Sequence, residues 1–207
     1  MKAAEQTMSA DEAPHCTGCQ AVMESPLVCS SCRRLFDSVD CNAFEAFGLP
    51  VAFDIDDDVL RARFLRLARQ THPDRFAAQT PGDRAAAERV NARLNEAYET
   101  LRRPASRAEY LLRLAGGPTA DEERFVPPEV LNDALLLREE IDEARAAGDE
   151  DALAALREQV RMKYDAHAAN IAELARKLPT DRDATLRPLR VALNSIRYYE
   201  RMLEQLT

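Results

Sequence analysis

The stretch Arg69-Gln70-Thr71-His72-Pro73-Asp74-Arg75-Phe76 separates two segments whose apolar residues recur at helical spacing. Because the ring of Pro73 disfavours helical geometry at the preceding residue, the first helix is expected to end at His72. The connection then carries His72, which can donate or accept a hydrogen bond, and Asp74, which can accept one. Two antiparallel helices joined here predict an α-helical hairpin. Either these two side chains only close and cap the loop, or they face a partner.

The helix before this stretch, residues 59–71, is expected to bury one face and to expose a basic one. Its buried face consists of residues at helical spacing, Leu60, Phe64, Leu67 and Ala68. Its other faces carry arginines with no acidic residue among them, Arg61, Arg63, Arg66 and Arg69. The residues in front of it are suited to cap its N-terminus, Asp54, Asp56, Asp57 and Asp58. The arginines form either a solvated surface or a docking surface for an acidic partner.

Further helices are expected around the hairpin. Residues 82–101 form its second arm, with an inward stripe of Ala86, Val90, Leu94, Ala97, Tyr98 and Leu101. A short helix over residues 42–47 lies across the hairpin and stops at Gly48 and Pro50. Pro104 opens one more helix over residues 104–115, which a Gly-Gly-Pro run ends. The middle of the chain, residues 41–115, is therefore predicted to be an all-α domain.

Four cysteines precede this domain as two close pairs, Cys16-x-x-Cys19 and Cys29-x-x-Cys32. Such pairs suit tetrahedral zinc, and few apolar residues separate them, so metal binding is expected to supply the folding energy of residues 15–40. We call this segment the knob and predict a structural zinc site in it. The alternatives are two disulfides, or idle cysteines in a disordered tail. Residues 1–14 are expected to be a disordered leader.

Three details bear on the knob. The residue after each second cysteine is Gln20 or Arg33, where many zinc knuckles carry glycine. His15 adjoins the first pair but is unnecessary as a ligand beside four thiolates. Cys41, the fifth cysteine, is expected to be a small buried filler.

The C-terminal part is predicted to be a three-helix antiparallel bundle over residues 128–207, after a Gly, Pro and acid-rich linker over residues 116–127. The first helix, residues 128–147, has one apolar stripe of Val130, Ala134, Leu137, Ile141 and Ala144. A second stripe starts apolar and turns acidic, Leu131, Leu135, Glu139 and Glu143. A bundle helix needs one buried face. The second stripe therefore either widens the core or forms a partner-binding rim.

The other two bundle helices show the same contrast. Residues 151–178 bury a stripe that includes His167, which is expected to be a satisfied core or boundary residue. The last helix buries Leu189, Leu193, Ile196, Tyr199, Leu203 and Leu206. Its nearly opposite side is more apolar than a free surface requires, with Val191, Tyr198 and Met202, and such a patch usually indicates a partner. Pro188 is expected to disturb the register of this helix before about residue 190.

The ordered set of local motifs resembles the HscB (Jac-type) family of J-domain co-chaperones. The motifs are Phe44-Glu45-Ala46-Phe47-Gly48-Leu49-Pro50, His72-Pro73-Asp74-Arg75-Phe76, Asn95-Glu96-Ala97-Tyr98-Glu99-Thr100-Leu101 and Arg107-Ala108-Glu109-Tyr110-Leu111-Leu112. Ordinary J-domains share the His-Pro-Asp tripeptide but not the last run. The resemblance covers about residues 42–207, and the knob is similar to an extension found on animal mitochondrial members.

The resemblance implies a co-chaperone of iron–sulfur cluster assembly with no active site of its own. Its J-domain would stimulate the ATPase of a DnaK/HscA-type chaperone through His72, Pro73 and Asp74 and the arginine-bearing helix. Its bundle would bind the IscU-type scaffold at family positions that fall on Leu131, Leu135, Glu139, Glu143 and Tyr198. At Leu136, where the family usually has a polar or acidic residue, this sequence departs from the pattern.

Composition narrows the remaining classes. The net charge of -8 over 207 residues argues against a general nucleic-acid binder. No apolar run approaches the roughly 20 residues that span a bilayer, and the first residues resemble neither a secretory signal nor a transit peptide. We therefore expect a bacterial cytoplasmic protein, or a mitochondrial-matrix one if it is an imported homologue.

Rival functions remain at this point. His72 and Asp74 could form a catalytic pair, or the cysteines an oxidoreductase site, but no nucleophile adjoins the former and no βαβ context surrounds the latter. Turnover without a chaperone would reveal such an enzyme. A zinc-bearing nucleic-acid adaptor, favoured by Arg33 and Arg34, would show salt-dependent binding. A J-protein adaptor for a different client is the remaining alternative.

Overall fold

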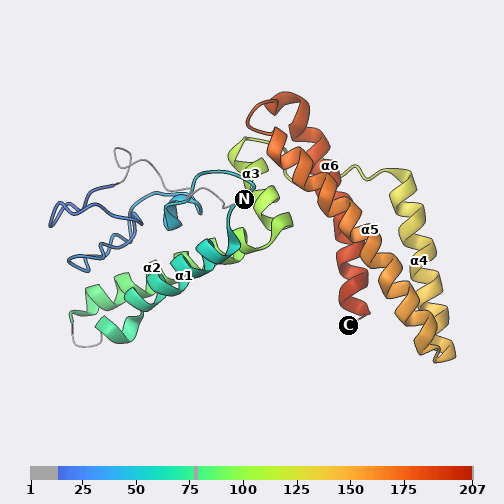
Figure 1. Cartoon of the computed structure of the whole chain (residues 1–207), viewed down its shortest axis with the longest axis horizontal. Coiled ribbons are helices and arrows are strands. Elements are labelled where there is room, and N and C mark those ends of the chain that lie inside the picture. Colours follow the sequence, from blue (N-terminus) through green and yellow to red (C-terminus); the bar gives the residue numbers. More distant parts are fainter. Residues whose placement is uncertain (1–13, 77–78, 207) are drawn as a thin grey trace. The chain divides into compact units, whose positions relative to one another are not determined.

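The computed structural model describes residues 14–76 and 79–206. The helical elements are, in chain order, the 3₁₀ turn η1 (Glu45–Phe47), α1 (Asp57–Gln70), the 3₁₀ turn η2 (Pro73–Phe76), α2 (Pro81–Arg102), α3 (Pro104–Leu114), α4 (Pro128–Ala147), α5 (Glu150–Lys177) and α6 (Arg182–Gln205) (Figure 1). Isolated β-bridges in the knob are the only extended pairing among the described residues. The predicted all-α class is confirmed. Of the predicted leader, residues 1–13 lie outside the described part of the chain.

The chain forms two compact units, Met1–Arg107 and Ala108–Thr207. The first unit contains the knob and the α1–α2 hairpin, and the second contains α4, α5 and α6. The division falls inside α3, which the sequence analysis placed as a whole in the J-domain. Among the described helices, none has both the length and the apolar character to cross a bilayer.

The first arm of the hairpin begins and ends where local chemistry predicts. The Asp56 carboxylate accepts the backbone N–H groups of Asp58 and Val59 at 2.9 and 3.0 Å, which caps α1. At the other end the Thr71 hydroxyl donates to the Leu67 carbonyl at 3.0 Å, and Pro73 prevents continuation. The helix is thus limited at both ends by side chains within a few residues of its termini.

The second arm, α2, starts with a capping box. The Thr80 hydroxyl oxygen accepts the Asp83 N–H while the Asp83 carboxylate accepts the Thr80 N–H, and Pro81 occupies the first turn. The two arms lie side by side (Figure 1). Between them the Phe64 and Tyr98 rings stack at 4.1 Å between centroids. The predicted inward stripe holds, except that Ala87 takes the fully buried position that was assigned to Ala86.

The short element before the hairpin is one 3₁₀ turn, so the predicted helix over residues 42–47 is wrong in type. The Asn42 side-chain oxygen accepts the N–H groups of Phe44 and Glu45 at 2.9 and 3.0 Å. These bonds cap the start of the turn, and the Ala46 N–H donates to the Asn42 carbonyl at 3.0 Å. The turn ends at Gly48, whose φ of +62° is left-handed.

Gly48→Ala is expected to lower the free energy of unfolding by about 2–4 kcal/mol, from left-handed strain plus overpacking. A Cβ at Gly48 would lie 2.3 Å from the Glu24 carbonyl oxygen, a backbone atom with little room to move. Gly148→Ala is the matched control, because Gly148 has a φ of +67° and nothing within 4 Å of the added Cβ. That variant should lose only about 1–2 kcal/mol. Urea unfolding measures both, and equal losses would contradict the steric argument.

The run Arg107-Ala108-Glu109-Tyr110-Leu111-Leu112 contributes to the packing of both units. In the first unit the buried Arg107 guanidinium donates to the Leu101 carbonyl at 2.7 Å and to the Phe53 carbonyl at 3.0 Å. In the second unit Glu109 accepts from the fully buried guanidinium of Arg190. Its charged residues are therefore structural, because they neutralise or satisfy buried groups.

The bundle is the predicted three-helix one, with α5 packed most extensively on α6 (Figure 1). Gly148 in a left-handed conformation ends α4, and the Asp149 carboxylate caps α5. The core cluster consists of Val130, Ala134, Leu137, Ile141, Ala144, Leu156, Val160, Tyr199, Met202 and Leu206. The assignment of Met202 to the exposed side was wrong, since only 7% of it is accessible. It lies under the rim that its neighbour Tyr198 helps to form.

Pro188 does not break the last helix, contrary to the expectation of disturbed register. α6 starts at Arg182 and continues through Pro188, and the predicted core residues Leu189, Leu193 and Ile196 are buried. A proline here removes the bond to the Ala184 carbonyl. Ala184 lies on the exposed side, where water can replace the missing donor.

Candidate functional site: a four-cysteine centre and two docking surfaces

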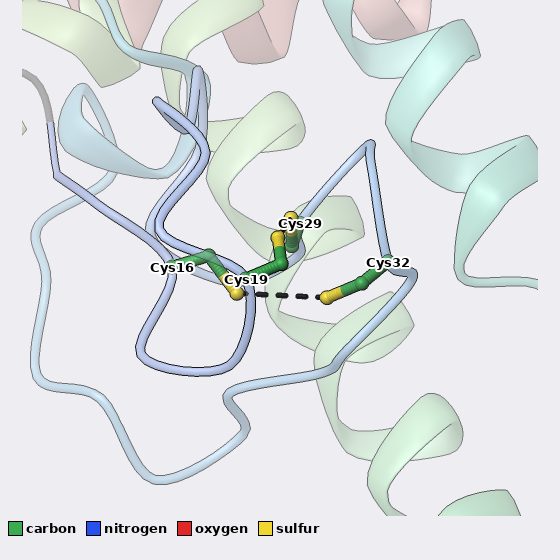
Figure 2. A group of neighbouring side chains, drawn as sticks. All are labelled: Cys16, Cys19, Cys29 and Cys32. Carbon is green, nitrogen blue, oxygen red and sulfur yellow. Dashed lines mark hydrogen bonds between the residues drawn. The ribbon is translucent and has the colours of Figure 1, made fainter.

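The four knob cysteines converge. Their sulfur atoms all lie within 4.8 Å of one another, with Cys16 Sγ 3.5 Å from Cys32 Sγ and Cys19 Sγ 3.6 Å from Cys29 Sγ. Figure 2 shows the side chains pointing toward one another from two loops. All four are free thiols, which contradicts the disulfide alternative. Because they gather in one cluster, the alternative of idle cysteines in a disordered tail is contradicted as well.

Two equivalent turns hold these cysteines. Cys16 N–H donates to the Ala21 carbonyl and Gln20 N–H to the Cys16 carbonyl, both at 2.9 Å. The same two bonds recur around Cys29, from its N–H to the Arg34 carbonyl and from Arg33 N–H to its own carbonyl. Gln20 and Arg33 have φ values of +59° and +62°, where glycine is usual. The turns that place the sulfur atoms therefore keep two non-glycine residues in a left-handed backbone conformation, at a cost of about 1–2 kcal/mol each.

The thiols perturb one another strongly. Backbone N–H groups of Cys32 and Ser31 lower the pKa of Cys29 to about 6. The Ala21 N–H lowers the pKa of Cys19, but burial and the neighbouring thiols together raise it to about 12. Crowded thiols cannot all ionise beside one another unless a cation compensates them. Four sulfur ligands at this spacing match a tetrahedral ion with metal–sulfur distances of about 2.3 Å, so the residues fit a metal site.

The knob is better packed than predicted. Met23 lies in a cluster with Cys16 and Cys29, against which Ala21 and Phe36 also pack. Leu27 and Val28 are buried as well. The expectation that this segment has no core of its own was therefore too strong. The cysteines pack with a small apolar cluster that the sequence analysis overlooked.

The His72-Pro73-Asp74 tripeptide lies at the surface at the end of α1. Pro73 starts the turn η2, and buried Phe76 anchors the end of that turn. The Asp74 N–H donates to His72 Nδ1 at 3.3 Å, while the Asp74 carboxylate is 3.6 Å from the same nitrogen. The side chains of His72 and Asp74 are 57% and 89% exposed, so both can reach a partner.

The four arginines of α1 differ in what they contact. Arg61 and Arg69 are exposed, and Arg69 Nε donates to the Leu65 carbonyl at 3.0 Å. Arg66 is about half exposed and pairs with the Glu24 carboxylate of the knob. Arg63 is only 9% exposed, so its assignment to the solvated faces was wrong.

Arg63 is buried because its guanidinium donates hydrogen bonds to two backbone carbonyls at the end of η1. One guanidinium nitrogen donates to the Phe47 and Gly48 carbonyls at 2.7 and 2.8 Å, and Nε lies 3.3 Å from the Glu24 carboxylate. Buried carbonyls and a buried cation satisfy each other in this arrangement. This role keeps Arg63 from acting as a docking side chain.

The bundle brings Leu131, Leu135 and Tyr198 together in one groove of about 270 Å³. Ala134, Met202 and Gln205 also line it, and Leu136 is exposed beside it on α4. Glu139 and Glu143 are exposed farther along the same helix. The three apolar residues of the predicted rim thus share one groove, and the two acidic ones are exposed on α4 outside its lining.

Arg138 and Arg201, which sequence reasoning missed, border the same groove. Each stands three residues after an apolar rim residue, Leu135 or Tyr198, and this helical spacing was a usable signal. The groove therefore combines an apolar centre with two basic neighbours.

A polar cluster on another side of the bundle was also missed. The Asp133 carboxylate accepts from Lys163 Nζ at 2.5 Å and from the Tyr199 hydroxyl at 2.9 Å. His167 stacks on the Tyr199 ring at 5.0 Å between centroids, and burial lowers the pKa of this half-buried imidazole. The prediction of a satisfied boundary histidine agrees with this position.

Comparisons with known proteins agree with the two-part organisation. A family model described as the DnaJ domain matches residues 44–110, and one described as the HSCB C-terminal oligomerisation domain matches residues 126–207. The chain is similar to chaperone HscB from Vibrio cholerae, with 30% identity, a TM-score of 0.69, and coverage of 80% of this chain and 95% of that one. It also shares the fold of the human co-chaperone protein HscB, with 24% identity, a TM-score of 0.73, and coverage of 93% and 96%.

The identity and coverage of the Vibrio cholerae match go beyond a shared fold, since nearly the whole of that chain is aligned. The two family models match the hairpin and the bundle separately, in the order that the sequence motifs predicted. The chain therefore belongs to the HscB family of J-domain co-chaperones, and this membership supports a co-chaperone role in iron–sulfur cluster biogenesis.

Proposed function

We propose that this chain stimulates the ATPase of a DnaK/HscA-type chaperone through its J-domain while its bundle binds an IscU-type scaffold. The observation that supports this most is the pairing of two exposed features in one chain. These are the His72-Pro73-Asp74 turn and the apolar groove of Leu131, Leu135 and Tyr198. Folding of the chain does not require an exposed apolar groove, and such a patch usually indicates a partner.

On the chaperone side, the proposed contact is electrostatic and local. Arg61 and Arg69 present positive charge on the helix that leads into the exposed tripeptide, within a chain whose net charge is -8. Complementary charge steers association and sets orientation more than it adds affinity. The arginines would align an acidic chaperone surface, and His72 and Asp74 would then contact it.

On the scaffold side, the groove has the anatomy of a protein interface. Apolar side chains form its centre, Arg138 and Arg201 border it, and Glu139 and Glu143 are exposed farther along α4. In such interfaces a few central apolar or aromatic residues carry most of the binding energy, and the polar rim excludes water.

The two activities belong together because tethering raises effective concentration. A scaffold bound to the bundle is held near the chaperone that the J-domain engages, so capture becomes effectively intramolecular. The chain itself needs no catalytic residue for this function, since the chaperone hydrolyses the ATP.

A reconstituted ATPase assay tests the proposal. The purified chain is titrated into a DnaK/HscA-type chaperone with and without an IscU-type scaffold. We expect stimulation in both series and a larger effect with scaffold. If stimulation does not change with scaffold concentration and calorimetry detects no scaffold binding, an adaptor for a different client is favoured. If the chain does not stimulate the chaperone at all, the J-domain function is rejected.

The metal of the knob is proposed to be structural zinc in a reducing compartment such as the cytoplasm, where four thiols stay available. Elemental analysis should find about one zinc per chain. Cys32→Ser is expected to lose the metal and to lower the midpoint of thermal unfolding of the first unit, since ligation contributes folding energy. Cys41→Ser is the matched control, because Cys41 lies outside the cluster and contacts Arg93 instead. Zinc retained in Cys32→Ser, or lost in Cys41→Ser, would contradict the assignment.

A further inference from the structure

Polar contacts fix the knob to the hairpin within the first unit. The Asp37 carboxylate accepts from Arg89 at 2.5 and 2.8 Å. Arg93 donates to the Asp37 carbonyl at 3.2 Å and to the Val39 carbonyl at 2.7 Å. The knob is therefore docked on the J-domain through its own acidic and carbonyl groups.

A further contact joins the knob to α1, the proposed chaperone-docking helix. The carboxylate of Glu24 bonds to Arg66 and also lies 3.3 Å from Arg63 Nε. Arg63 is buried, so Arg66, with 47% of its side chain exposed, is the arginine of this pair that a partner can still reach. The Glu24 carboxylate of the knob is thus already paired with Arg66, the guanidinium that an acidic partner would bind.

The position of Glu24 depends on the cysteine cluster. Its neighbour Met23 is buried against Cys16 and Cys29, and Ser25 on its other side is fully buried. Met23 N–H donates to the Pro14 carbonyl at 2.7 Å, and the Ser25 hydroxyl oxygen accepts the Leu27 N–H at 3.2 Å. The segment that carries Glu24 is therefore ordered by the same packing that positions the metal ligands.

We propose that Glu24 is an intramolecular ligand of Arg66, held in place by the metal-folded knob, and that it competes with the acidic chaperone for this arginine. Loss of the metal releases Glu24, frees Arg66 and tightens docking. The proposal rests on the proposed chaperone-docking function, but the Glu24–Arg66 pair can be tested without any chaperone.

The first experiment measures the accessibility of individual arginines. The full chain is treated with phenylglyoxal, and modification of each arginine is followed by mass spectrometry. Arg66 should react about two- to fivefold faster in Glu24→Gln and in metal-stripped wild type, as for loss of an exposed ion pair. Arg61 should not change. Glu88→Gln is the matched control, since it removes one charge from the Glu88–Arg84 pair of the same unit. An Arg66 rate that Glu24→Gln leaves unchanged would overturn the proposal.

The second experiment measures docking. The concentration of chain that gives half-maximal chaperone stimulation should fall about two- to fivefold in Glu24→Gln, more at low salt, and should not fall in Glu24→Gln/Arg66→Gln. Weaker or unchanged docking by Glu24→Gln would overturn the competition even if Arg66 became more reactive. If wild type fails to stimulate at all, the proposed function fails and the competition with it, while the phenylglyoxal rates separately decide whether the pair exists.

Discussion

Replacing His72 by Gln is expected to abolish chaperone stimulation, with at least about a tenfold loss, while scaffold binding keeps its affinity. The His72 imidazole accepts the Asp74 N–H and is exposed, so it both shapes the tripeptide and contacts the partner. Glutamine cannot reproduce a planar ring with this acceptor geometry. Steady-state ATPase assays measure the first effect, and calorimetry with scaffold measures the second.

The structure supplies a matched control for this variant. His15→Gln makes the same chemical change at another exposed histidine of the first unit, outside the cysteine set. It should leave stimulation unchanged. Substitution of an exposed side chain away from caps and buried contacts typically changes stability by less than about 0.5 kcal/mol, so unfolding should not explain the result. Loss of both activities in His72→Gln would contradict the division of labour between hairpin and bundle.

Truncating the groove is expected to have the second large effect. Leu135→Ala/Tyr198→Ala should weaken scaffold binding by roughly a hundredfold, since central interface residues contribute about 1–2 kcal/mol each or more. Both side chains are partly exposed in the free chain and line the groove. Their truncation therefore removes binding contacts with little change in the core. Calorimetry gives the affinity, and thermal unfolding checks that the bundle is intact.

Met162→Ala is the control for this double variant. Met162 is a large exposed apolar residue of α5 in the same unit, outside the groove. Scaffold affinity should be unchanged by its truncation, and chaperone stimulation without scaffold should be unchanged in every bundle variant. An unaltered dissociation constant for the Leu135/Tyr198 variant would place the scaffold elsewhere on the chain.

Local sequence pattern predicted the helices well because their determinants are local. Apolar spacing, the caps at Asp56 and Asp149, and the prolines at the helix starts act within a few residues. Two elements departed from expectation for equally local reasons. Left-handed Gly48 ends the first element after one 3₁₀ turn, and the carbonyl that Pro188 leaves without a donor belongs to exposed Ala184, so α6 continues.

The candidate sites divide in the same way. The cysteine spacing was sufficient to predict a four-sulfur centre, because two tight turns must bring such pairs together. Helical spacing also placed Leu131 and Leu135 on one edge of α4. It did not reveal that Arg138 of α4 and Tyr198 of α6 line one groove, since that depends on how the two helices pack.

The sequence by itself determined the all-α class, the order of hairpin and bundle, the family and the grouping of the cysteines. Only the tertiary structure decided which arginines of α1 remain available and which apolar residues of α6 are exposed. Arg63 and Arg66 meet Glu24 across about forty residues of chain, and Met202 is buried by helices that precede it. A side chain's periodic position restricts the directions in which it can point, but its burial and charge partner depend on segments that are distant in sequence and meet only on folding.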